Sequence, residues 1–233
     1  PFLFIMSLIN TVWGELRYSI AEEMQQGSFI GNISLDLRLD VKQLTARNAR
    51  VVSEGKGQYC QLNVNTGILF VDERIDREEL CGKISVCTLE FRIILDSPIK
   101  FYSVALEVQD INDNPPSFQE NEITFEISES TLPGARFPLE SAHDPDVGSN
   151  SINSYKLSTN DHFVLDIGTW AHGTNYGDLL LEKALDREQQ ARFSLILTAI
   201  DGGTPQRSAP ISHHTTRKSG PVPSSTDTAT MCV

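Results

Sequence analysis

Short stretches of alternating apolar and polar residues run through the first half of the chain, and alternation with period two is typical of half-buried β-strands. Turn-forming groups such as Asn65-Thr66-Gly67 and Ser97-Pro98 separate these stretches. In the last of them we expect Phe101, Val104, Leu106 and Val108 to face inward. The predicted strands are 18–20, 29–33, 61–64, 68–71, 89–95 and 101–108, whereas 35–44 is compatible with a short helix or an irregular crossover.

The same pattern restarts after the double proline Pro115-Pro116, with strands predicted at 123–127, 179–181 and 193–200. Two sequence markers recur at nearly one offset. Ile75-Asp76-Arg77-Glu78 returns as Leu185-Asp186-Arg187-Glu188, and the end of Ser19-Ile20-Ala21-Glu22 returns as Ile127-Ser128-Glu129. Such a repeat indicates two copies of one domain of about 100 residues. Many short strands separated by turns predict an all-β protein built of sandwiches.

The two ends of the chain depart from this pattern. Residues 1–14 are apolar but shorter than the roughly 20 residues that span a bilayer, so we interpret them as the remnant of a signal peptide, with a buried strand as the alternative. Residues 208–233 are rich in Ser, Thr and Pro, and we expect a disordered tail there. The predicted domains are therefore 15–114 and 115–207, the second without its last strand.

The charge of the chain limits its partners. The sequence holds 31 acidic and 19 basic residues, a net charge of −12, which argues against nucleic acid and anionic membranes as partners. The acids also fall into short clusters rather than being spread evenly. Clustered acids favour a cation as the ligand.

The densest cluster is the segment Asp110–Pro116, which reads Asp-Ile-Asn-Asp-Asn-Pro-Pro. Side-chain and carbonyl oxygens at this density suit Ca²⁺, which takes six to eight oxygen ligands. The two prolines impose an extended path and remove backbone donors. The segment is therefore interpreted as a stiffened linker between the two domains that carries metal ligands.

In combination, these motifs resemble the cadherin superfamily. The resemblance rests on the early Glu22, Asp76-Arg77-Glu78, the linker motif, Asp144-Pro145-Asp146 with Asn150, and Ala199-x-Asp201-Gly202-Gly203. Within the superfamily the chain is similar to the clustered protocadherins, through 17–20, 27–33, 74–80 and the Cys81-x5-Cys87 loop. The resemblance implies two tandem Greek-key (immunoglobulin-like) β-sandwich cadherin repeats, the second truncated.

The resemblance also implies about three calcium ions where the two repeats join. The carboxylates expected to bind them are Glu22, Asp76, Glu78, Asp110, Asp113, Asp144, Asp146 and Asp201, together with Asn112 and the main-chain carbonyls of Ile111, Asn114 and Asn150. Glu22, Glu78, Asp113 and Asp146 are each assigned to two ions. Any one of these clusters alone would be interpreted as a solvated acidic surface. Without metal the carboxylates are expected to repel one another and the linker to hinge.

The function implied by the resemblance is calcium-dependent cell–cell adhesion. The expected partner is another protocadherin molecule on an apposed cell, in homophilic pairing, and also one on the same cell, with no nucleic acid and no small-molecule substrate. The parent protein is expected on the extracellular face of the plasma membrane. This fragment, which has no membrane span, is expected to be secreted. The family pairs through its first four repeats, so a fragment with two should adhere poorly alone. Trp13 precedes the expected cleavage point, which disfavours adhesion by swapping an N-terminal strand.

An enzyme is the alternative from another functional class. A secreted carbohydrate-active β-sandwich enzyme would use paired carboxylates in a cleft lined with aromatic residues. Here the acids border a linker, and only 8% of the residues are aromatic. No sequence motif for a catalytic nucleophile or a catalytic zinc is present. The sequence therefore predicts a protein that is not an enzyme.

Cysteines and one sequon complete the candidate sites. Cys81 and Cys87 enclose five residues and are predicted to form a disulfide in an oxidising compartment. Cys60 is interpreted as a small buried apolar residue, while the states of Cys60 and Cys232 stay open. Asn32-Ile33-Ser34 matches the N-glycosylation sequon but lies in a predicted strand, so Asn32 is a candidate glycosylation site only.

Overall fold

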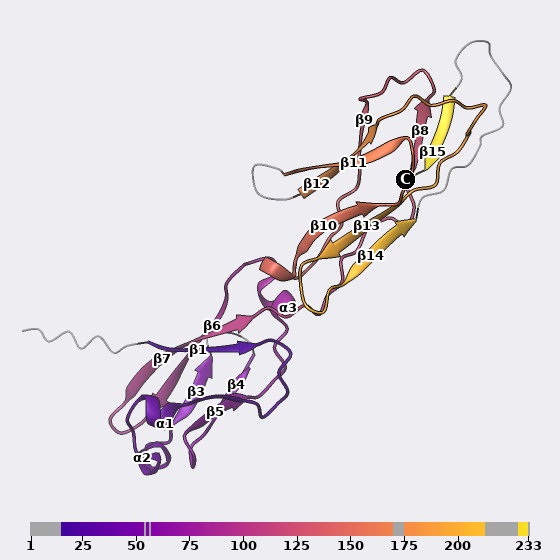
Figure 1. Cartoon of the computed structure of the whole chain (residues 1–233). Coiled ribbons are helices and arrows are strands. Elements are labelled where there is room, and N and C mark those ends of the chain that lie inside the picture. Colours follow the sequence, from indigo (N-terminus) through magenta and orange to yellow (C-terminus); the bar gives the residue numbers. More distant parts are fainter. Residues whose placement is uncertain (1–14, 54, 56, 170–174, 213–227, 233) are drawn as a thin grey trace, which may run out of the picture. The chain divides into compact units, whose positions relative to one another are not determined.

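The computed structural model describes residues 15–53, 55, 57–169, 175–212 and 228–232, which belong to two compact units that meet between Asp110 and Ile111 (Figure 1). The boundary that the sequence predicts, between residues 114 and 115, lies a few residues further along the chain. The interpretations of residues 1–14, including Trp13, and of 213–227 fall outside the described residues. No helix in the described part of the chain is long and apolar enough to cross a bilayer.

The first unit is a sandwich of two β-sheets. One sheet has the strand order β1-β7-β6-β3 and the other β2-β5-β4. Strand β1 runs parallel to β7, and the remaining pairs are antiparallel. The strands are β1 (Leu16–Ala21), β2 (Phe29–Asn32), β3 (Arg50–Ser53), β4 (Cys60–Asn63), β5 (Ile68–Val71), β6 (Cys87–Leu95) and β7 (Lys100–Gln109).

Strand β7 shows how alternation builds the core of this unit. Tyr102, Val104, Leu106 and Val108 are all buried. Phe101, which the sequence placed inward, is 58% exposed, so this prediction was wrong. Successive side chains of a strand point to opposite faces, and residue 101 has the opposite parity to 104, 106 and 108. The position of Phe101 in the strand, rather than its apolar character, decides which face its side chain occupies.

Short helices connect the strands of the first unit. Helix α1 (Ile33–Asp36) begins after Asn32, whose Oδ1 accepts a hydrogen bond from the Leu35 N–H at 3.2 Å. Helix α2 (Val41–Ala46) begins after Asp40, whose carboxylate accepts from the Lys42 N–H at 2.9 Å. Both are ordinary N-caps, which satisfy backbone donors of the first turn. Of the two alternatives for 35–44, short helices are therefore correct. A third helix, α3 (Arg77–Cys81), lies between β5 and β6.

The second unit is also built of β-strands. Its sheets have the orders β10-β13-β14, β11-β12-β9 and β15-β8. Leu179, Leu181, Leu197 and Ala199 are buried in its core. The elements are β8 (Thr124–Ser128), β9 (Arg136–Pro138), the 3-10 turn η1 (Gly148–Asn150), β10 (Ile152–Leu157), β11 (Phe163–Thr169), β12 (Asn175–Leu181), β13 (Ile196–Asp201), β14 (Ser208–Ser212) and β15 (Thr228–Cys232).

The end of the second unit differs from the prediction of a disordered tail from Ser208 and a missing last strand. Strand β14 pairs antiparallel with β13, and β15, drawn in yellow in Figure 1, pairs antiparallel with β8. The repeat is nevertheless truncated, since β14 has 5 residues where β7 of the first unit has 10. The Ser- and Pro-rich composition gave no indication of β14, in which Ile211 is the one large apolar residue and is buried.

Strand β14 should contribute measurably to the stability of the second unit. Ile211→Ala removes a buried side chain from the core, and such substitutions cost about 2–5 kcal/mol. The matched control is Ile196→Ala in β13, because Ile196 is 43% exposed; that change should cost less than about 1 kcal/mol. Urea unfolding of the whole chain measures both. Equal, small losses for the two variants would contradict the assignment of β14 to the folded repeat.

Candidate metal centre

The acids of the first unit gather where β1 ends and α3 begins. Asp76 is the N-cap of α3, and its Oδ1 accepts a hydrogen bond from the Glu79 N–H at 2.9 Å. Glu22 directly follows β1, and its Oε2 accepts a hydrogen bond from the Arg77 N–H at 2.8 Å. This bond spans 55 positions of sequence. The fold therefore brings the early Glu22 to the Asp-Arg-Glu motif.

One guanidinium group lies among these carboxylates. The side chain of Arg77 is only 1% exposed. Its Nη2 lies 2.6 Å from Glu78 Oε1, and its Nε lies 2.6 Å from Asp110 Oδ1 and 4.0 Å from Glu22 Oε1. Three carboxylates thus share one positive charge. Glu22 is itself buried, and buried charges that lack full compensation are costly.

The pKa of Glu78 reflects this crowding. It is raised to about 7, first by burial and then by the hydrogen bond and negative charge of Glu22, while the charge of Arg77 acts in the opposite direction. A raised pKa means that the protein site favours the neutral form of this carboxyl group more than water does. A divalent cation at this place would offset the negative charges of Glu22 and Glu78 and so favour the ionised form of both carboxylates. The donor set of the first unit therefore fits a calcium ion.

In the second unit, the linker residues hold Asp146. Asn114 donates from Nδ2 to Asp146 Oδ1 at 2.8 Å and from its main-chain N–H to Oδ2 at 3.2 Å. The N–H of Asp146 in turn donates to Asp144 Oδ1 at 3.1 Å. Both aspartates are buried. The candidate residue Asn150 ends the turn η1, shortly after this Asp-Pro-Asp motif.

A second group of linker contacts surrounds Asp201 at the end of β13. Asn112 donates from Nδ2 to Asp201 Oδ2 at 2.9 Å and to the Pro205 carbonyl at 2.6 Å. The Arg207 N–H lies 2.9 Å from both carboxylate oxygens of Asp201. Asp201 is fully buried. A Cβ on Gly203 would lie 2.3 Å from Asn112 Cγ, so this position needs glycine to let Asn112 approach.

The side-chain oxygen of Asn112 has the properties expected of a metal ligand. With its Nδ2 engaged, its Oδ1 is buried and has no hydrogen-bond donor among the described residues. A buried polar atom without a partner costs about 1–3 kcal/mol, and an amide oxygen is a common calcium ligand. Neighbouring Asp113 is held through its carbonyl, which accepts from Arg207 Nη1 at 2.7 Å. The Ile111 carbonyl accepts the Asp113 N–H at 2.9 Å.

The structure therefore groups the predicted ligands within each unit. Around Arg77 it places Glu22, Glu78 and Asp110, with Asp76 capping the same helix. The linker residues of the second unit contact Asp146 and Asp201. Two arginines that the sequence analysis gave no role, Arg77 and Arg207, hold these groups. The position of Arg77 inside the Asp-Arg-Glu motif could have indicated its role from the sequence. No motif includes Arg207, so nothing in the sequence indicated its role.

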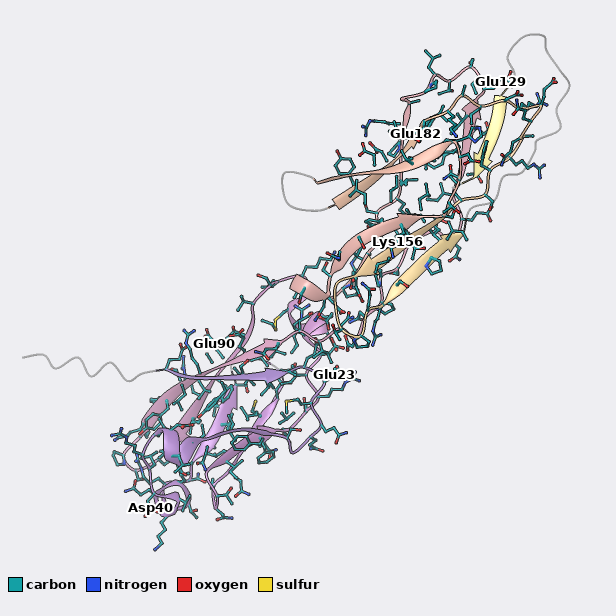
Figure 2. All side chains as sticks on the ribbon, viewed as in Figure 1. Glu23, Asp40, Glu90, Glu129, Lys156 and Glu182 are labelled. Atoms are coloured by element: carbon teal, nitrogen blue, oxygen red, sulfur yellow. A yellow bond between two sulfur atoms is a disulfide. The ribbon has the colours of Figure 1, made fainter. Side chains whose placement is uncertain are left out.

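The second unit repeats the acids of the first at Glu129, Asp186 and Glu188, but these side chains are more exposed. Glu129, labelled in Figure 2, follows β8 as Glu22 follows β1, but it is half-buried whereas Glu22 is buried. Asp186 and Glu188 are exposed. Asp186 caps its own turn by accepting from the Glu188 N–H at 2.9 Å. No second Asp-x-Asn-Asp-Asn follows in the sequence, so these acids form only part of a ligand set.

The cysteine predictions can be checked directly. Cys81, the last residue of α3, and Cys87, the first residue of β6, form a disulfide, which confirms the predicted pair. Cys60 is buried in the core of the first unit, as predicted, and it is a free thiol, which the sequence left open. Burial, and secondarily the charge of Asp72, raises its pKa to about 12. The side chain of Cys232 lies outside the described part of the structure.

Asn32 is only partly available for glycosylation in this fold. Besides capping α1, its Oδ1 accepts a hydrogen bond from Ser34 Oγ at 2.7 Å. The residue is half-buried and is the last residue of β2, as the sequence predicted, while it also serves as the N-cap of α1. Its modification stays a prediction.

Comparison with known proteins gives consistent matches for both units. The family model for cadherin-like domains matches residues 15–97, and the model for the cadherin domain matches 123–214. Human protocadherin-10 is 47% identical over 199 residues, which cover 85% of this chain and 19% of the relative. Human protocadherin gamma-C3 is 46% identical over 212 residues, which cover 91% and 23%. The chain thus spans about a fifth of these relatives' length.

Solved structures agree with the sequence comparison. A structure of mouse clustered PcdhgC3 EC1-3 has 49% sequence identity and a TM-score of 0.81, and it covers 84% of this chain and 63% of that one. A structure of protocadherin gamma C5 EC1-3 has 45% identity and a TM-score of 0.80, with 85% and 64% covered. These relatives are adhesion proteins rather than enzymes, so the carbohydrate-active alternative is set aside. The chain belongs to the cadherin superfamily and, within it, to the protocadherins, of which it carries two consecutive repeats.

Proposed function

We propose that this chain is a calcium-binding, adhesive part of a protocadherin. The observation that carries the proposal is the concentration of buried oxygens at the predicted ligand positions of each unit. In the first unit, three carboxylates share the single guanidinium of Arg77. In the second, the buried Oδ1 of Asn112 has no hydrogen-bond donor in the described part of the chain. Both features are unfavourable in a metal-free protein and are relieved by a divalent cation.

The proposed ligand set is the one that the cadherin resemblance implies. About three calcium ions would be held by residues of both repeats, with an affinity in the extracellular range of about 10⁻⁴–10⁻³ M. The first would take Glu22, Asp76, Glu78 and Asp113. The second would share Glu22, Glu78 and Asp113 and add Asp110, the Ile111 carbonyl and Asp146. The third would take Asn112, Asp144, Asp146, Asp201 and the carbonyls of Asn114 and Asn150.

The contacts of these residues suit the roles assigned to them. Asp76 uses Oδ1 to cap α3, which leaves Oδ2 for an ion. Glu22 is held at Oε2 by the Arg77 N–H, which fixes the carboxylate before any ion arrives. Bound calcium would supply the positive charge that compensates these carboxylates. The chain supplies preorganised oxygens, and preorganisation reduces the ordering cost of binding.

Membership of the family supports the adhesive part of this proposal. The partner would be another protocadherin molecule on an apposed cell, in homophilic pairing, with a further contact on the same cell, and the location would be extracellular. Because the chain has two repeats and spans about a fifth of the relatives' length, we expect weak adhesion by the chain alone.

A chimaeric receptor tests this proposal. The matching repeats of human protocadherin gamma-C3 would be replaced by residues 15–212 of this chain, and cells expressing the chimaera would be mixed. Cells carrying the same chimaera should aggregate at about 1 mM calcium and disperse when calcium is chelated. Unmodified gamma-C3 serves as the positive control. A chimaera that reaches the cell surface but does not aggregate, or that aggregates equally after chelation, would contradict calcium-dependent adhesion.

A further inference from the structure

The Cys81–Cys87 disulfide closes a loop at the end of the helix that carries the candidate metal ligands. Helix α3 has 5 residues, with Asp76 as its N-cap and Cys81 as its last residue. At a rise of about 1.5 Å per residue, its two ends are only about 7 Å apart. The disulfide then fixes the C-terminal end of α3 to the first residue of β6. The metal-binding end and the covalently anchored end thus belong to one short element.

Arg77 connects the loop to the carboxylates through one planar group. Its Nη1 donates to the carbonyls of Gly82 and Ile84, both at 3.1 Å. Its other two nitrogens face Glu78 and Asp110 at 2.6 Å. The guanidinium is rigid and planar, so its donors cannot be redirected independently. A movement of the loop carbonyls therefore changes the positions that Arg77 imposes on the carboxylates.

Charge neutralisation alone does not account for this arrangement. A side chain that only neutralises the acids needs to be close to them but needs no contact with uncharged carbonyls, whereas Nη1 of Arg77 donates hydrogen bonds to two carbonyls of the loop. Arg77 is also buried, so water cannot readily replace the loop carbonyls if they move away. Calcium–oxygen distances fall within a narrow range of about 2.3–2.6 Å. Displacements on the order of 1 Å in the carboxylates therefore weaken binding.

We propose that Arg77 is a positioning residue that couples the Cys81–Cys87 disulfide to calcium binding by Glu22, Glu78 and Asp110. The intact disulfide holds the loop carbonyls, the carbonyls orient the guanidinium, and the guanidinium presents the carboxylates. The coupling is reciprocal by thermodynamic linkage: if the disulfide raises calcium affinity by some factor, calcium favours the oxidised disulfide by the same factor. This inference rests on the proposed calcium function.

The first experiment is a double-mutant cycle on the whole chain, with calcium affinity measured by titration calorimetry. Replacing both cysteines, Cys81→Ser with Cys87→Ser, should weaken calcium binding about five- to tenfold, within the usual range of coupling between sites. Arg77→Lys keeps the charge but loses the fork, and should weaken binding similarly. In the Arg77→Lys background, removing the disulfide should change the affinity less than about twofold, because the connection is already broken. Cys60→Ala is the control for loss of a thiol elsewhere in the unit, and should leave the affinity unchanged.

The second experiment measures the reverse direction. The Cys81–Cys87 pair is equilibrated with dithiothreitol, which passes two electrons and two protons to the pair and itself closes to a cyclic disulfide. Saturating calcium should lower the equilibrium constant for reduction by the factor found in the titration; a tenfold change corresponds to about 30 mV. In Arg77→Lys this calcium dependence should vanish. Because the disulfide of that variant is intact at the start, the test holds even if the double serine variant does not fold.

The outcomes separate this inference from the proposed function. Suppose that the wild-type chain binds calcium, that removal of the disulfide leaves the calcium affinity unchanged, and that calcium leaves the equilibrium constant for disulfide reduction unchanged. The coupling is then refuted while the calcium function stands. If the effects of the serine and lysine substitutions simply add, or if Arg77→Lys keeps its calcium-dependent reduction, Arg77 does not transmit the coupling. If the wild-type chain binds no calcium, both proposals fall together.

Discussion

Asp113→Ala should weaken calcium binding more than substitution of any proposed ligand that is assigned to a single ion. Asp113 is assigned to two ions at once, so its removal leaves two coordination shells short of a carboxylate. The remaining seven carboxylates would stay crowded around the vacancy. A tenfold loss of affinity, about 1.4 kcal/mol, is the least we expect. Because extracellular calcium only modestly exceeds dissociation constants of about 10⁻⁴–10⁻³ M, that loss would empty much of the proposed site.

The backbone at this position should survive the substitution. The Asp113 carbonyl, which accepts from Arg207, is present in alanine as well, so the variant isolates the carboxylate. Asp161→Ala is the matched control, since Asp161 is an exposed acid of the same unit outside the proposed ligand set. Calcium titration of both variants measures the difference. If the two variants bind calcium alike, the assignment of Asp113 to two ions is wrong.

Calcium, but not magnesium, should raise the thermal stability of the chain. A ligand that binds only the folded state stabilises it by about 1.4 kcal/mol per site at ten times its dissociation constant. For domains of this size, each kcal/mol raises the Tm by roughly 4–8 °C. Magnesium prefers six ligands in a tight octahedron and dehydrates reluctantly, so a carboxylate-rich site built for a larger ion should respond little to it.

Calorimetric scans in calcium, in magnesium and after chelation measure this selectivity. We expect the chelated and magnesium-containing samples to unfold at nearly the same temperature, several degrees below the calcium-containing sample. An equal rise in both metals would indicate general screening of the −12 net charge rather than coordination.

The sequence predicted strands well where alternation is strong and poorly where pairing supplies the stability. Alternation located β6 and β7 almost completely. It gave no indication of β3, β9, β10 or β11. Strand β3 (Arg50–Ser53) has only 4 residues, and β9 (Arg136–Pro138) ends in proline. These segments become strands through hydrogen bonds to β6 and β12, and such pairing depends on contacts distant in sequence.

At the candidate site, too, short motifs could be recognised in the sequence, whereas contacts between residues far apart in the sequence could not. The acidic motifs could be recognised locally, because each is a short run of oxygen-bearing residues. The hydrogen bond from Asn112 to Asp201 spans 89 positions, and nothing in either motif identifies its partner. The fork of Arg77, which contacts both carboxylates and loop carbonyls, likewise requires the folded geometry. Candidate ligands could thus be proposed from the sequence, whereas the groups that position them could not.

Counting bound calcium ions by titration calorimetry tests the central claim most directly. The chain carries one full set of proposed ligands and one partial set, in which Asp186 and Glu188 are exposed and no second linker motif follows. We predict about three ions per chain with dissociation constants of about 10⁻⁴–10⁻³ M. A count near six would show that the partial set also binds calcium. The absence of any binding at millimolar calcium would contradict the claim that these buried carboxylates form a calcium site.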